Sequence, residues 1–271
     1  MRYNILFVIL FIIFTSLKID EQKPWIITKG RRVTLFTRPP HYNKSPSPDS
    51  LTILKIINEQ ENLIDRINNR LGTDFQSNVN IYLYNLDESN EKIGTIGGGR
   101  ARSTGFRRNI YFTYRQNPTF NPITKEYVYI GAHEMVHIIA DNQLGRKTTR
   151  FFGEGYACAL SGNYGSKKQG DRMVFIRNDS TLAKMIALDQ FLLPSALIDN
   201  DSLPAREYYP QIGCLVNWML ETYGAESINR IYNSRRTDIK TKFQQVTGVS
   251  FEEMEQLYIE HCNTEVVSQT R

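Results

Sequence analysis

The chain has 271 residues, of which 41% are hydrophobic, so it can bury one sizeable core or the cores of two small lobes. No period of 20–50 residues recurs, which argues against a repeat architecture. The net charge is +5, and no nucleic-acid-binding motif accompanies it. Five arginines lie close together, and they fit either a solvated strand pair or a patch for acidic substrates or anionic surfaces: Arg100, Arg102, Arg107, Arg108 and Arg115.

Residues 1–19 are predicted to be a signal peptide or signal anchor. Arg2 precedes an uninterrupted apolar run from Ile5 to Phe14, and Lys18 closes it. The run is shorter than the roughly 20 residues of a full membrane span, and no A-x-A cleavage pattern precedes Lys18. A buried strand or helix is the alternative. We expect the rest of the chain to lie outside the cytoplasm, as a periplasmic, secreted or membrane-anchored protein held by residues 4–17.

The first strands are expected within residues 24–38, on either side of Lys29-Gly30. A helix is predicted next, because apolar residues recur at helical spacing from Leu51 to Leu71. Its start signal is Ser47-Pro48-Asp49-Ser50, and Gly72 is a natural stop. Alternation around Val79, Ile81 and Leu83 then indicates a strand. Two further strands are predicted at about 93–102 and 108–114. The triple glycine 97–99 fits either a bulge or a place where a ligand backbone comes close.

The second half reads as helical, beginning with a segment from about Lys125 to Asn142. The other predicted helices are 153–161, 181–193, 206–222, 226–233, 237–246 and 251–262, and Ser250 with Glu253 forms a capping box before the last. Strands therefore gather early and helices late, which predicts an α+β fold. We expect a β-rich lobe at 24–145, a helical lobe at 146–262 and a tail at 263–271.

The three cysteines, Cys158, Cys214 and Cys262, are too few for a disulfide scaffold, and an odd number cannot all pair. We expect buried thiols with at most one disulfide.

The segment HEMVH carries the clearest chemical signal in the chain. On a helix, His133 and His137 lie four residues apart and share a face, so both imidazoles can bind one metal ion. Glu134 is one step round and can act as a general base without binding the metal. Zinc is the usual ion for such a site. The alternative is a core helix whose histidines are hydrogen-bonded, although burying these polar groups without a partner is costly.

A third ligand must come from another segment, and Glu154 is the best candidate. It follows a loop that lets the chain fold back, and Gly153 and Gly155 leave room around it. Two histidines and a carboxylate complete a catalytic zinc set. The alternative is an exposed glutamate that complements a helix dipole.

HEMVH followed by FFGEGYACALSG resembles the gluzincin metallopeptidases, in particular the peptidase-MA-like branch of the thermolysin and aminopeptidase-N clan. The family segment is W-x-x-E-G-x-A-x-x-x-S-G, and Phe151 stands in place of its Trp. The similarity covers about residues 75–262. It implies a zincin-like fold, zinc ligands His133, His137 and Glu154, and Glu134 as base. It also implies a peptide substrate that pairs with the strand at 93–102.

A second segment, YYPQIGCLVNWMLETYG, is similar to a family segment whose first Tyr stabilises the oxyanion. That position is Tyr209, with Tyr208 as the adjacent competitor; a packing tyrosine at a helix start is the alternative. Thermolysin-type enzymes carry an Asp where this chain has Cys158, and Asp141 is a candidate partner for a ligand histidine. The aminopeptidase motif G-x-M-E-N is absent from the sequence, which argues against recognition of a free amino terminus.

The sequence therefore predicts a zinc-dependent metallopeptidase of the endopeptidase type, with Glu134 as general base. Two alternatives stay open: a zinc hydrolase of a non-peptide bond, and a non-catalytic peptide-binding module.

Overall fold

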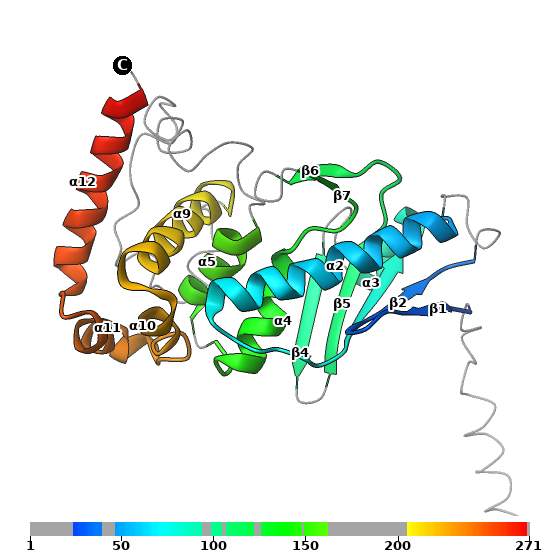
Figure 1. Ribbon diagram of the computed structural model, residues 1–271, viewed down its shortest axis with the longest axis horizontal. Helices are drawn as coiled ribbons and strands as arrows, with labels where there is room; N and C mark the ends of the chain where they lie inside the picture. Colours follow the sequence, from blue (N-terminus) through cyan, green and yellow to red (C-terminus); the bar gives the residue numbers. More distant parts are fainter. Residues whose placement is uncertain are drawn as a thin grey trace, which may run out of the picture.

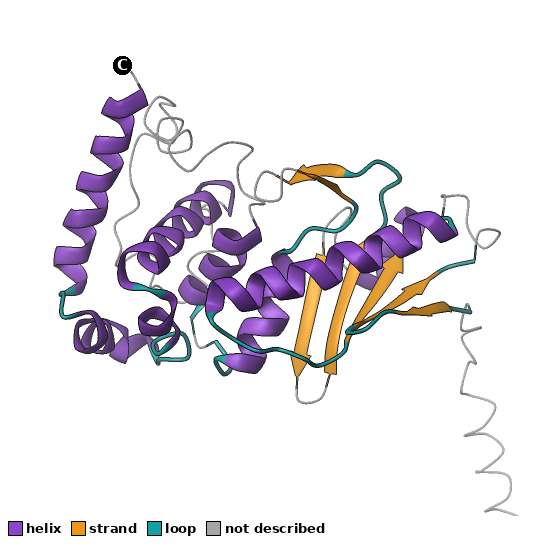
Figure 2. Cartoon of the chain, viewed as in Figure 1, coloured by secondary structure: helices purple, strands orange, loops and turns teal. Residues whose placement is uncertain are grey.

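The computed structural model describes residues 24–39, 47–93, 99–104, 107–121, 126–147, 149–161 and 205–269. The predicted signal segment 1–19 and the predicted helix 181–193 lie outside these residues. Within the described ranges, no helix has the length and apolar character needed to cross a membrane. Figures 1 and 2 show a sheet with its covering helix on one side of the molecule and a group of helices on the other.

A mixed five-stranded sheet forms the first part of the molecule. Its strands lie in the order β1 (Ile26–Lys29), β2 (Val33–Thr37), β3 (Val79–Tyr84), β5 (Arg107–Thr113) and β4 (Gly99–Thr104). β2, β3 and β5 run parallel, whereas β1 and β4 are antiparallel to their neighbours. Both edges of the sheet are therefore antiparallel strands. The prediction of an α+β fold is confirmed at this level.

Helix α2 (Ser50–Leu71) lies across one face of the sheet (Figure 1). The predicted start and stop signals both operate, because Asp49 accepts a hydrogen bond from the Thr52 N–H and Gly72 ends the helix with φ +63°. Apolar core side chains occupy alternate positions of β2 and β3 and recur at helical spacing along α2. The core includes Leu35, Ile81 and Ile110 from the sheet and Ile56, Ile64 and Ile67 from the helix.

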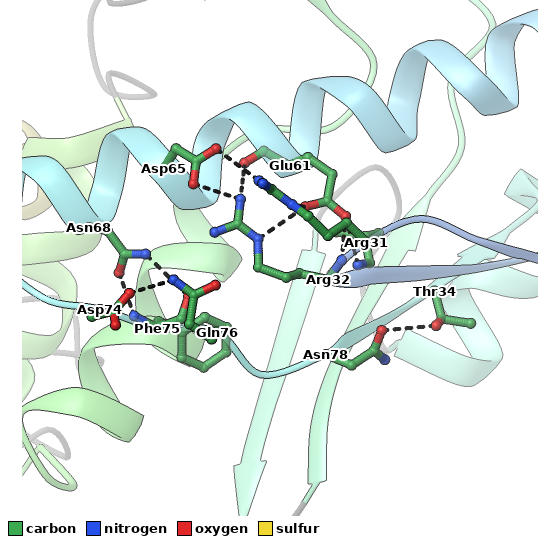
Figure 3. Close-up of polar contacts among 11 residues, drawn as sticks. Arg31, Arg32, Thr34, Glu61, Asp65, Asn68, Asp74, Phe75, Gln76 and Asn78 are labelled. Carbon is green, nitrogen blue, oxygen red and sulfur yellow. Dashed lines mark hydrogen bonds and ion pairs between the residues drawn. The ribbon is translucent and has the colours of Figure 1, made fainter.

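An ion cluster fixes the start of β2 against α2 (Figure 3). The Arg32 side chain is 4% exposed, and its Nε lies 3.1 Å from Glu61 Oε2 while Nη2 lies 2.7 Å from Asp65 Oδ1. The Glu61 carboxylate also accepts the backbone N–H groups of Arg32 and Val33. A buried charge with this many partners ties strand and helix to one register.

The remaining described elements are mostly helical. They are α3 (Leu86–Ile93), the hairpin β6 (Thr119–Asn121) and β7 (Glu126–Val128), α4 (His133–Gln143), α5 (Arg150–Ser161), α9 (Ala205–Tyr223), α10 (Ala225–Asn229), the 3₁₀ helix η1 (Arg236–Asp238), α11 (Ile239–Thr247) and α12 (Phe251–Gln269). At α12, Ser250 Oγ accepts the Glu253 N–H, as the capping box predicted. Cys158, Cys214 and Cys262 are all buried thiols outside any disulfide, in agreement with the prediction.

Helices α5 and α9 pack closely because each contributes a glycine to the contact. A Cβ on Gly155 would lie 2.5 Å from Val216 Cγ2, and a Cβ on Gly213 would lie 2.7 Å from Cys158 Cβ. Neither position has room for a larger residue. The space that Gly155 was expected to leave for Glu154 thus accommodates helix α9 instead.

Several predicted boundaries were wrong. The last predicted helix, 251–262, continues as α12 to Gln269, so most of the expected tail 263–271 is helical, and the predicted helix 226–233 is helical only from Ala225 to Asn229. The predicted strand 93–102 is cut short, because residues 86–93 form helix α3 and strand β4 begins at Gly99. The predicted helix from Lys125 starts only at His133, because residues 126–128 pair with β6. In these last two places short polar and apolar runs fit two kinds of element, and pairing with a neighbouring segment decided between them.

Candidate metal centre

The two histidines of HEMVH project from the first two turns of α4. Their ring centroids lie 4.8 Å apart, and the ring planes are at 89° to each other. His137 is buried, and the His133 side chain is 14% exposed. The spacing of four residues therefore places both imidazoles on one face of the helix, as the sequence predicted.

Glu154 of α5 completes the cluster. Its Oε2 lies 3.1 Å from His133 Nε2 and 3.6 Å from His137 Nε2. One possible ligand atom from each residue lies within 4.8 Å of the others. Helix α5 begins at Arg150, so Glu154 sits in its second turn with a side chain only 18% exposed. It is therefore not the exposed, dipole-complementing glutamate that was the alternative.

The electrostatics of the cluster favour an ionised carboxylate. Burial alone would raise the pKa of Glu154, but hydrogen bonds and charge from His133 and His137 outweigh it and hold that pKa far below its ordinary range. A half-buried carboxylate facing two imidazoles is a donor set typical of a catalytic zinc site with an open position. The residues present therefore fit a zinc ion, with His133, His137 and Glu154 as the three protein ligands.

Helix α5 is held in place by aromatic packing and a partly buried chain of hydrogen bonds. Phe151, Phe152 and Tyr156 are fully buried. The Tyr156 hydroxyl donates to Asn229 Oδ1 at 3.1 Å, and Asn229 Nδ2 donates to the Leu71 carbonyl at the end of α2. This chain links α5 to α10 and α2, so the position of Glu154 depends on contacts far from it in sequence.

The second ring nitrogen of His137 has a partner that sequence reasoning missed. Lys147 Nζ lies 2.9 Å from His137 Nδ1. A Cβ on Gly153 would lie 2.2 Å from Lys147 Cδ, so Gly153 makes room for this side chain rather than for Glu154. Asp141, the predicted partner, accepts hydrogen bonds from the Tyr232 hydroxyl and the Lys147 backbone N–H. Asp141 therefore helps to hold the backbone of Lys147, whose side chain contacts His137.

The Glu134 side chain, on helix α4, lies against the edge strand β4. A Cβ on Gly99 would lie 2.8 Å from Glu134 Cγ and 2.6 Å from the Phe112 ring. The last glycine of the triple therefore lets the β4 backbone approach Glu134. The other two, Gly97 and Gly98, lie outside the described residues. Glu134 is half-buried and is not among the three converging ligands.

Tyr209 is half-buried near the start of α9, and its hydroxyl accepts a hydrogen bond from Arg150 Nη2. Burial and the negative charge of Glu154 raise the pKa of the Tyr209 phenol, and the Arg150 guanidinium opposes this rise. The phenol is thus electrostatically coupled to a member of the cluster. The side chain of Tyr208 lies outside the described part of the chain.

The arginines of the basic patch do not share one environment. Arg100 and Arg102 are exposed on β4, on the face that also carries Tyr111 and Asn109 of β5. Arg108 is half-buried and donates to Asn142 Oδ1 of α4 at 2.9 Å. The patch is therefore partly a structural link between the sheet and the helix that carries the histidines.

No known family model matches the chain, and no curated protein is detectably similar to it in sequence. The function of the chain is therefore inferred from the chemistry of the cluster of His133, His137 and Glu154.

Proposed function

We propose that the chain is a zinc-dependent metallopeptidase of the gluzincin type, with a zincin-like arrangement of sheet and helices. One observation carries the proposal: two imidazole nitrogens and the half-buried carboxylate of Glu154 converge, while a second carboxylate, Glu134, lies on the helix of the two histidines and outside this cluster. A structural core helix has no need of this division between ligands and a separate carboxylate.

His133, His137 and Glu154 would hold the zinc ion, which would act as the Lewis acid that activates water and polarises the carbonyl. Glu134 is the general base: it accepts a proton from the attacking water and then delivers that proton to the leaving amine. Tyr209 donates a hydrogen bond to the oxyanion that develops on the scissile carbonyl. Each of these groups is half-buried or buried, which limits competition from bulk water.

The edge of β4 is the natural place for a peptide substrate. Among the described residues β4 ends the sheet, so its outer backbone groups can pair with an added extended strand. Because Gly99 lies against Glu134, a substrate paired there would run next to the base. This geometry favours peptides over small esters, and the predicted N-terminal segment would place the activity outside the cytoplasm.

The direct test is zinc analysis of the purified chain together with cleavage of a mixed peptide library. We expect one zinc per chain and cleavage within peptides. A chelator such as 1,10-phenanthroline should abolish cleavage, and added zinc should restore it. A zinc-loaded chain that cleaves no peptide in the library would contradict the proposal.

Replacement of Tyr209 by Phe should lower kcat by about 10²–10³ while leaving KM and zinc content nearly unchanged, because one oxyanion donor is lost. Steady-state kinetics with a peptide found in the library would measure this. Tyr208→Phe is the neighbouring control and should have a much smaller effect. A larger effect at Tyr208 would transfer the oxyanion role to that residue.

A further inference from the structure

Arg150 occupies the first position of α5, one helical turn before Glu154. Residues four apart on a helix share a face, so Arg150 and Glu154 project on the same side of α5. The guanidinium donates to the Tyr209 hydroxyl, and its Cζ lies 5.4 Å from the centroid of the Tyr209 ring. Arg150 thus connects the helix that carries a proposed ligand to the phenol on α9.

The direction of this hydrogen bond has a chemical consequence. A guanidinium carries donors and no acceptor, so the Tyr209 oxygen must accept. The hydroxyl hydrogen is not used in this contact and can be donated to another acceptor. A charged donor also makes this contact stronger than a bond between two neutral groups. The contact therefore fixes the position of the phenol and lets it donate its hydrogen elsewhere.

We propose that Arg150 is a positioning residue, which holds the Tyr209 phenol by its oxygen so that the phenol donates its hydrogen to the substrate oxyanion. The inference rests on the proposed function. The family segment that the chain resembles begins at Phe151, so the resemblance assigns no role to Arg150. Arg150 acts through Tyr209.

A double-mutant cycle in the full chain tests the connection between the two residues. Arg150→Met removes the donors but keeps an unbranched side chain, and Arg150→Lys keeps a positive donor. We expect Arg150→Met to lower kcat roughly tenfold with KM and zinc content unchanged, and Arg150→Lys to recover part of the loss. In a Tyr209→Phe background, Arg150→Met should have no further effect on kcat.

A second measurement does not depend on hydrolysis. In protein labelled with ¹³C at tyrosine Cζ, the Tyr209 resonance is the one that disappears in Tyr209→Phe. Arg150→Met should shift this resonance and raise the pH at which it titrates, because the guanidinium favours the ionised phenol. If the wild type hydrolyses no peptide, the proposed function fails, and this resonance still decides whether Arg150 holds the phenol.

Three results would overturn the role of Arg150. The first is that Arg150→Met lowers kcat as much in the Tyr209→Phe background as in the wild type, which would mean that Arg150 acts independently of Tyr209. The second is an unchanged Tyr209 resonance in folded Arg150→Met. A rise in KM without a fall in kcat would also contradict the proposal, since it would assign Arg150 to substrate binding instead.

Discussion

Glu134→Gln is expected to keep its zinc and its fold and to lose peptide hydrolysis by about 10²–10⁴ or more. The amide has nearly the same size and keeps the contact with Gly99, but it cannot accept a proton from water. Glu134 is not among the three ligand residues, so zinc content should not change. Single-turnover cleavage of a library-derived peptide, beside elemental analysis of the same sample, measures both quantities.

Glu226→Gln is a matched control for this variant. Like Glu134, Glu226 is an acidic residue in the first turn of a helix, so both substitutions remove a similar favourable interaction with the helix dipole. Glu226 belongs to α10, outside the cluster, and its loss should leave hydrolysis intact. An active Glu134→Gln enzyme would end the proposed mechanism, and equal losses in both variants would point to an effect on folding.

Local patterns were sufficient to predict the elements whose signals agree with one another. Helix α2 has apolar residues at helical spacing, an Asp49 cap and a Gly72 stop, and all three signals operate in the structure. Strand β3 alternates cleanly because one of its faces packs against α2 while the other carries Tyr82 and Asn80. Such segments can be predicted from sequence because their apolar pattern, caps and packing all agree.

Helix α3 and strand β7 were missed for the opposite reason. α3 is eight residues long, and β7 has three residues that form a strand only by pairing with β6. Tyr127 in β7 is 61% exposed, so its apolar character suggested a buried helix face that it does not provide. Short elements set by pairing leave little periodicity to detect.

The candidate metal site likewise combines contacts that the sequence predicted with contacts that it did not. The pairing of His133 with His137 follows from helix geometry alone, and the sequence therefore predicted it. The approach of Lys147 to His137 and of Arg150 to Tyr209 depends on how loops and helices meet in space. The sequence did indicate that Gly153 makes room for a neighbouring side chain. It could not indicate that this side chain is Lys147, which fills the space beside Gly153.

His137→Ala is expected to lose stoichiometric zinc, because it removes one of the three proposed ligands. The loss should exceed the 10–100-fold in affinity that is typical for removal of a residue that merely supports a ligand. Zinc binding also stabilises the folded state, by about 2.7 kcal/mol when free zinc is 100 times Kd. Thermal unfolding with and without zinc should thus show a zinc-dependent rise for the wild type and none for His137→Ala.

The matched control is His261→Ala, which removes an imidazole from α12 at a place where it packs near Trp218 and not in the cluster. This variant should keep full zinc and its thermal shift. Glu154→Gln should behave like His137→Ala, since an amide oxygen lacks the charge of the carboxylate that both imidazoles face. Full zinc content in His137→Ala and in Glu154→Gln would mean that the metal is held elsewhere in the chain. Loss of zinc in these two variants with retention in His261→Ala is the pattern that the three converging side chains require.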